Sequence, residues 1–174
     1  MEYYSHMLRL AKSLSEILIL SMGSPISVAD TFTTDANMNL KLLHYPPHTS
    51  TDARQFGAAE HTDFGVLTIL LQQPGREGLQ VLLNEVGWVD VPAREDVFVV
   101  NLGDLTCKWT NGRYRSTVHR VVNRSEGGKG ERYSVPCFFE GNLQAKNPFD
   151  LEGGDEETVE MHIRRKLEGT YGLK

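Results

Sequence analysis

Apolar residues recur every three or four positions near both ends of the chain. In the first segment these positions are Tyr4, Met7, Leu8, Ala11, Leu14, Ile17 and Leu18. The spacing puts their side chains on one face of an amphipathic α-helix, and the Gly-Ser-Pro sequence at 23–25 predicts its end. Residues 156–171 have the same pattern, with Gly169 as the expected stop. We therefore expect a helix near each end of the chain.

Between these helices the chain consists of short apolar runs separated by clusters of Gly, Pro, Asn and Asp. The runs cover residues 40–45, 66–71, 79–83, 88–91, 97–101, 116–122 and 133–139. Their length, spacing and content of Val, Ile, Leu and Phe predict β-strands arranged as a sandwich or a barrel. Because the chain has neither an internal repeat nor a domain linker, we expect one domain over residues 1–174, mainly β with flanking helices.

Composition and charge limit the kinds of molecule that the protein is expected to bind. The 174 residues, 40% of them hydrophobic, are enough for one soluble globular domain with a substantial core. The net charge of -5 comes without any long basic run, so neither nucleic acid nor an anionic membrane is an expected partner. The apolar stretch at 14–22 is too short for a membrane span and lacks the flanks of a signal peptide. A small-molecule substrate is therefore predicted.

The two cysteines, Cys107 and Cys137, are isolated in the sequence. Such a pair makes neither a disulfide framework nor a four-ligand zinc site. A reducing compartment, the cytoplasm, is the simplest expectation. The sequence carries no indication of the oligomeric state.

His61 and Asp63 are the most specific chemical signal in the chain. Residues i and i+2 of an extended segment point to the same face and can converge on one metal ion, and His119 supplies a third ligand from a later strand. Two histidines and one carboxylate match the facial triad of non-haem iron(II), which leaves coordination positions open for oxygen and a further ligand. Because this ligand set leaves a net positive charge on the site, an anionic chelating ligand such as a 2-oxo acid is favoured.

A structural role is the alternative for these histidines. The chain has six histidines, and a histidine on a strand usually has its hydrogen bonds satisfied within the protein. His6, His44, His48 and His162 are assigned to that class. A His-x-Asp pair occurs often by chance, so the surrounding sequence has to decide between a metal-binding and a structural role.

The context is a series of segments that resembles a known family. The segments LKLLHYPP, AAEHTDFGVLTILLQ, GLQVLLNEVGWVDVP, FVVNLGDLTCKWTNGRYRSTVHRVV and ERYSVPCFFEGN follow one another over residues 40–142. In wording and order they resemble the iron(II)- and 2-oxoglutarate-dependent oxygenases of the plant and fungal type, which include isopenicillin N synthase and flavonoid oxygenases. The resemblance implies a double-stranded β-helix, a cupin-like jelly roll whose two sheets enclose the metal.

The resemblance also implies a function. The chain is expected to be the catalytic domain of such an enzyme without the family's N-terminal region. With Fe(II), 2-oxoglutarate and O2 it would oxidise a small organic molecule in secondary metabolism, by hydroxylation, desaturation or ring formation. The short form is expected to bind metal but to be weakly active or prone to aggregation.

Three further residues take their expected roles from the family. Its Arg-x-Ser motif binds the distal carboxylate of 2-oxoglutarate, which assigns that role to Arg132 and Ser134. Both side chains would leave the same face of a strand, and a guanidinium holds a carboxylate through paired hydrogen bonds. Tyr45 stands at the place of a family tyrosine that touches the same carboxylate, although a buried tyrosine would give the same sequence. Leu43 stands where some plant members carry an asparagine near the cosubstrate.

Other residues are weaker candidates for the walls of the site. Leu67, Leu70 and Val121 would line the chamber, but apolar residues in strands belong to the core by default. Phe138, Phe139 and Glu140 follow the Arg-x-Ser strand and could face the substrate. Since neighbouring side chains in a strand alternate, at least one of the two phenylalanines must point away.

Two alternatives stay open. Isopenicillin N synthase and aminocyclopropane carboxylate oxidase share the triad and the Arg-x-Ser pattern without using 2-oxoglutarate, so the chain could be an iron oxidase of that kind. It could also be a non-catalytic jelly-roll binding module whose histidine cluster is structural or holds zinc. The sequence identifies no substrate.

Overall fold

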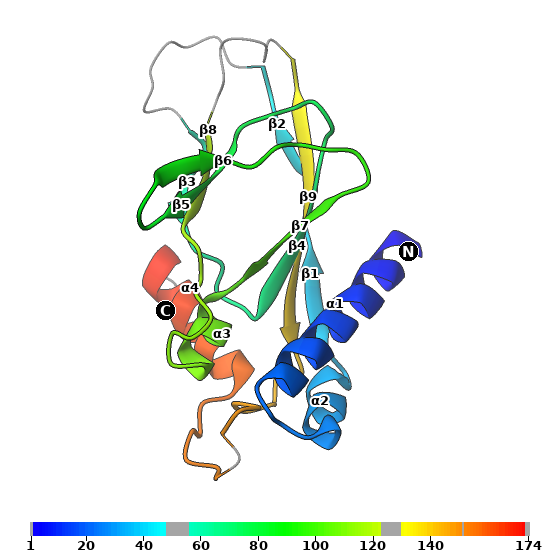
Figure 1. Ribbon diagram of the computed structural model, residues 1–174, viewed down its shortest axis with the longest axis vertical. Coiled ribbons are helices and arrows are strands. Elements are labelled where there is room, and N and C mark those ends of the chain that lie inside the picture. The colour runs from blue at the N-terminus through cyan, green and yellow to red at the C-terminus, as the bar shows by residue number, and fades with distance from the viewer. Residues whose placement is uncertain (1, 48–55, 123–129, 151, 173–174) are drawn as a thin grey trace.

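The structure of the protein is a computed structural model that describes residues 2–47, 56–122, 130–150 and 152–172. Two antiparallel sheets face each other, as Figure 1 shows. The first sheet has the order β1-β9-β4-β7, with β2 also paired to β9, and the second has the order β3-β8-β5-β6. The strands are β1 Asn37–Leu40, β2 Leu43–Tyr45, β3 Phe56–His61, β4 Leu67–Gln72, β5 Leu79–Leu83, β6 Gly87–Asp90, β7 Phe98–Leu102, β8 His119–Val122 and β9 Arg132–Gly141.

This arrangement confirms the expected fold class, a mainly β jelly roll with flanking helices. The helices are α1 Glu2–Ser21, α2 Ile26–Thr33, α3 Asp104–Trp109 and α4 Val159–Tyr171. In Figure 1, α1 and α2 cover the outer face of the first sheet, whereas α3 and α4 lie together at one end of the space between the sheets. In the part of the chain that the structure describes, no helix has the length and apolar character needed to cross a membrane.

The main hydrophobic core lies between α1, α2 and the outer face of the first sheet. Ala11 of α1, Ile69 of β4 and Phe139 of β9 are completely buried there. The Phe32 ring of α2 meets the Phe139 ring edge to face, with 6.4 Å between ring centroids. Burying one such aromatic or aliphatic side chain stabilises the fold by about 2 kcal/mol. This core holds the first sheet in place, and the other face of that sheet points toward the second sheet.

The helix at each end was predicted correctly, and the last residue of the second one is Tyr171 as expected, but Gly169 was the wrong residue for its stop. α4 begins after the N-cap Thr158, whose side chain accepts a hydrogen bond from the amide of Met161, and it runs through Gly169. The helix ends at Gly172, which has a left-handed backbone with φ of 63° and donates to the carbonyl of Glu168. A glycine ends a helix where it takes this conformation, and Gly169 does not.

The sequence pattern placed one strand incorrectly and missed two helices and one strand. The predicted strand at 40–45 contains β2 and only the last residue of β1, and both strands pair with β9. The short helices α2 and α3 were not predicted, because they span only 8 and 6 residues and so contain too few turns to show a helical period. β3, with the sequence FGAAEH, was missed because it lacks the branched and aromatic residues typical of strands.

Candidate metal centre

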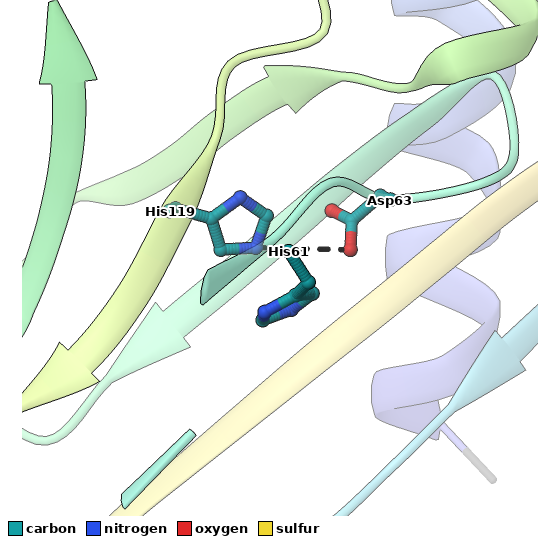
Figure 2. Close-up of side chains that lie close together, drawn as sticks. All are labelled: His61, Asp63 and His119. Atoms are coloured by element: carbon teal, nitrogen blue, oxygen red, sulfur yellow. Dashed lines mark ion pairs between the residues drawn. The ribbon is translucent and has the colours of Figure 1, made fainter. Parts of the chain in front are cut away.

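Three side chains converge in the space between the two sheets. His61 ends β3, Asp63 follows two residues later, and His119 begins β8. One ligand atom from each lies within 4.8 Å of those of the other two, and Figure 2 shows the two imidazoles and the carboxylate close together. Antiparallel pairing of β3 with β8 puts His61 opposite His119, with 4.3 Å between ring centroids. Strand register therefore brings together residues that are far apart in the sequence.

Both histidines have the same backbone contact, and it determines which ring nitrogen is free. The Nδ1 atom of His61 lies 2.7 Å from the carbonyl oxygen of Ala59, and that of His119 lies 3.0 Å from the carbonyl oxygen of Thr117. Because a carbonyl oxygen can only accept, each Nδ1 must carry the proton and donate it. In the neutral ring each Nε2 then keeps its lone pair, which is the arrangement seen in histidines that bind metals.

Asp63 is buried, with 7% of its surface exposed, and two donors meet one of its oxygens. The Thr68 hydroxyl donates to Oδ2 over 2.6 Å, and the Asn101 amide donates to the same atom over 2.7 Å. The other oxygen, Oδ1, lies 3.8 Å from Nε2 of His119, as the dashed line in Figure 2 shows. Sequence reasoning missed Thr68 and Asn101. The signal that could have found them is that each is the polar residue of an otherwise apolar run.

The loop that carries Asp63 is held by the start of α3. The amides of Gly103 and Asp104 donate to the carbonyl oxygens of Val66 and Asp63 over 2.9 and 2.7 Å. A Cβ atom at residue 103 would lie only 2.2 Å from the carbonyl oxygen of Gly65, so this close approach requires glycine. The backbone on the C-terminal side of the candidate ligand is thereby fixed.

The side chain of Asp104 makes a second connection to this loop. Its Oδ2 accepts from the Thr62 hydroxyl over 3.1 Å and from Lys166 of α4 over 2.6 Å. Burial opposes ionisation of Asp104, but hydrogen bonds, that from Lys166 first, together with the charge of Lys166 outweigh it and keep its pKa below the usual value. An ionised carboxylate therefore joins α4 to the residue between His61 and Asp63.

The Arg-x-Ser pair lies on β9 of the first sheet and lines the same cavity as the three converging side chains. Arg132 and Ser134 are both buried, and the Arg132 guanidinium donates to Gln72 over 3.2 Å and to the Ser134 hydroxyl over 3.5 Å. The Tyr45 ring lies 4.8 Å from the guanidinium carbon. Gln72 is a further residue that the sequence analysis did not identify.

Arg132 has no ion pair with any described residue, and its Nε atom lacks a hydrogen-bond partner among them. Burial lowers the pKa of Arg132 from its usual value, although Tyr45 and the charge of Glu77, which lies beyond ion-pairing distance, act in the opposite direction. A buried cation without a counter-ion is costly. The site therefore favours an anionic ligand beside Arg132.

One cavity of about 110 Å³ contains both groups of residues. Its lining consists of Leu43, Tyr45, Ala58, His61, Asp63, Thr68, Leu70, Leu79, Val81, Val99, Asn101, Thr117, His119, Val121, Arg132, Ser134, Pro136 and Phe138. All six candidate ligand and cosubstrate residues thus face one mostly apolar space. Apolar walls strengthen the electrostatic interactions inside a cavity, although His61 itself is exposed to solvent.

The weaker sequence candidates divide between this cavity and other places. Leu70, Val121 and Phe138 line the cavity as expected. Leu67 does not: it belongs to the core beneath α1, because it has the opposite strand parity to Thr68 and Leu70. Phe139 likewise points away and is fully buried in that core.

Glu140 lies beyond the end of this cavity. It lines a separate cavity of about 410 Å³ beside α4. Its carboxylate accepts hydrogen bonds from the amides of Asn37 and Asn39 over 2.5 and 3.3 Å. Burial raises the pKa of Glu140 despite these two donors.

The histidines assigned to structural roles stay away from the three converging side chains. His6 is exposed on α1 beside Arg9, His44 stacks on Tyr133 with 4.7 Å between centroids, and His162 is buried against Glu157. His48 lies outside the described residues. Cys107 and Cys137 are both free thiols.

Comparisons with known proteins agree with this geometry. Residues 36–141 match the sequence profile of the 2OG-Fe(II) oxygenase superfamily. The chain is 51% identical over 174 residues to the 2-oxoglutarate-dependent dioxygenase traH of Penicillium crustosum, covering 99% of this chain and 52% of that protein. It is 48% identical over 173 residues to the 2-oxoglutarate-dependent dioxygenase caaD of Aspergillus niger, covering 99% of this chain and 53% of that protein.

Solved structures that contain alpha-KG are also similar to this chain. The crystal structure of a full-length Neurospora crassa protein in complex with alpha-KG and thymine superposes with a TM-score of 0.84 at 30% identity, over 98% of this chain and 55% of that one. The chain thus spans about half the length of the curated relatives and solved structures that it matches.

Proposed function

Since the chain belongs to the 2OG-Fe(II) oxygenase superfamily, we propose that it carries the iron(II) and 2-oxoglutarate site of an enzyme that oxidises a small organic molecule. His61, Asp63 and His119 would hold the metal through two imidazole nitrogens and one carboxylate oxygen. This donor set is the one that suits non-haem iron(II), and the free Nε2 atoms support it. Bound iron(II) with 2-oxoglutarate and O2 would supply the oxidising chemistry.

Arg132, Ser134 and Tyr45 would bind the distal carboxylate of 2-oxoglutarate. The observation that carries the proposal is the buried guanidinium of Arg132, which has no ion-pair partner among the described residues and shares a cavity with the three candidate metal ligands. A dicarboxylate that reaches both would neutralise the Arg132 cation and the positive charge of the metal site. Gln72 would hold the guanidinium in place from the other side, since it accepts from Arg132 over 3.2 Å.

The chain's other contribution is the shape of the cavity and its mostly apolar lining. Leu70, Val81, Val99 and Phe138 present apolar side chains around the candidate ligands, and apolar walls limit the access of water to a reacting centre. The fungal relatives, named as 2-oxoglutarate-dependent dioxygenases, support an oxidation of a small molecule in secondary metabolism. They also favour this function over an iron oxidase that does not use 2-oxoglutarate.

The test is anaerobic titration of the chain with Fe(II) and then with 2-oxoglutarate, following the visible absorption band of the iron chelate. We expect the band in wild type and its loss in Asp63→Ala and His119→Ala. His44→Ala is the matched control, because that histidine lies on the outer side of the sheet against Tyr133, and it should keep the band. Absence of iron binding in wild type would contradict the proposal.

Two readouts distinguish the alternatives. Iron binding without a chelate band, and oxygen consumption without succinate, would indicate the oxidase that needs no 2-oxoglutarate. Binding of Zn(II) but not of Fe(II) would indicate the non-catalytic binding module.

A further inference from the structure

The carboxylate of Asp63 is held asymmetrically. The Thr68 hydroxyl and the Asn101 amide both donate to Oδ2, over 2.6 and 2.7 Å. Oδ1 receives neither donor and faces Nε2 of His119 at 3.8 Å. A carboxylate oxygen offers about two lone-pair directions, so two close donors saturate Oδ2. Only Oδ1 retains a free lone pair toward the space between the histidines.

The two donors come from adjacent strands whose pairing places them together. Thr68 of β4 and Asn101 of β7 are direct partners in the strand register, and both side chains line the cavity. Thr68 is 4% exposed, so its hydroxyl has no access to bulk water as an alternative partner. The backbone of Asp63 is fixed separately, because its carbonyl oxygen accepts from the amide of Asp104 over 2.7 Å. Both the backbone position and the rotation of the carboxylate are therefore determined.

We propose that Thr68 and Asn101 are positioning residues that restrict Asp63 to binding the metal through a single oxygen. The inference rests on the proposed function, since it takes Asp63 to be a ligand. Two imidazole nitrogens and one carboxylate oxygen leave three positions of an octahedral ion free. A chelating 2-oxo acid occupies two of them, and one stays open. If Asp63 bound through both oxygens, that last position would be lost.

The test uses Mn(II), which binds oxygen and nitrogen ligands without redox chemistry. We expect Thr68→Val and Asn101→Ala each to weaken Mn(II) binding by about 10–100-fold, the usual effect of removing a partner that orients a metal ligand. Thr68→Ser keeps the hydroxyl and should stay within about threefold of wild type. Thr33→Val is the matched control, because it removes another buried threonine hydroxyl, bonded to the carbonyl of Ala29 on α2.

A second readout separates a positioning role from a merely structural one. In the Mn(II) and 2-oxoglutarate complex, broadening of the Mn(II) resonance by oxygen-17 water counts exchangeable water positions. We expect one such position in wild type and none in the Thr68→Val/Asn101→Ala double variant. If either variant fails to fold, the other single variant and Thr68→Ser carry the affinity comparison.

The outcomes are distinct. Unchanged Mn(II) affinity in the folded variants, or an unchanged water count in the double variant, would overturn the inference and leave the metal site intact. Failure of wild type to bind Mn(II) would overturn the proposed site itself, and the inference with it.

Discussion

Lys166 of α4 donates to Oδ2 of Asp104 over 2.6 Å, and this contact joins the C-terminal helix to the loop of the candidate metal ligands. The same carboxylate oxygen accepts from Thr62, whose neighbours in the sequence are His61 and Asp63. Lys108 of α3 also pairs with Glu157, just before α4, over 2.6 Å. The position of α4 is therefore coupled to the site through charged hydrogen bonds, although no described side chain of this helix lines the cavity.

Removing the Lys166 ammonium should destabilise the chain measurably. We expect Lys166→Met to lower the free energy of unfolding by about 1–2 kcal/mol, because Asp104 would lose its charged donor while it stays mostly buried. Arg164→Met is the control, since its pair with Glu160 is largely exposed and should contribute less than about 0.5 kcal/mol. Urea denaturation of the metal-free chain measures both. Equal losses in the two variants would refute a special role for the Lys166 contact.

Replacing Arg132 should separate cosubstrate binding from metal binding. Arg132→Met removes the paired donors for a carboxylate, so we expect the affinity of the Mn(II)-loaded chain for 2-oxoglutarate to fall by at least about 100-fold. Arg132→Lys keeps the charge but not the planar fork and should fall by about 10-fold or more. Mn(II) affinity without 2-oxoglutarate should stay unchanged in both. Calorimetric titration provides all three values, and a parallel loss of Mn(II) affinity would contradict the assignment.

The adjacent residues Phe138 and Phe139 should respond differently to truncation. Phe139 is fully buried against Phe32, so Phe139→Ala should cost about 3–5 kcal/mol of unfolding free energy. Phe138 lines the cavity instead, and Phe138→Ala should cost less than half as much while changing the binding of ligands in the cavity. Urea denaturation compares the stabilities. Similar losses of stability at the two positions would argue against this division of the strand faces.

The ion pairs of Glu157 should give the chain an acid-sensitive contribution to stability. Burial raises the pKa of Glu157, but hydrogen bonds from Lys108 and Arg165 outweigh it and lower the pKa from 4.5 to about 2. A carboxyl with a lowered folded pKa stabilises the fold above its unfolded pKa, and this contribution is lost as the pH falls through the folded pKa. The loss is expected between pH 4.5 and 2.

The Glu157→Gln variant tests this window. It lacks the titrating group, so its free energy of unfolding should be lower than that of wild type at neutral pH and should fall less between pH 4.5 and 2. Denaturation at several pH values with EDTA present avoids any effect of metal release. Identical pH profiles for wild type and variant would show that Glu157 contributes nothing to acid sensitivity.

Local patterns in the sequence were sufficient to predict the class of fold and the types of residue in the candidate site. Alternation along strands has a period of two, so Arg132 and Ser134 were expected on one face, and they both line the cavity. The same rule required Phe138 and Phe139 to point to opposite sides, which the structure confirms. The prediction for Leu67 was wrong because Leu67 and Leu70 have opposite parity on β4, so their side chains point to opposite faces of the sheet.

Tertiary structure alone decided how the side chains are held. Thr68 and Asn101 are 33 residues apart in the sequence, and only the pairing of β4 with β7 brings both donors to the same oxygen of Asp63. Lys166 reaches Asp104 because α4 docks beside α3. Side-chain alternation and helical period are local properties that the sequence determines by itself. Strand register and helix docking depend on the packing of the whole chain, and they decided the orientation of the Asp63 carboxylate.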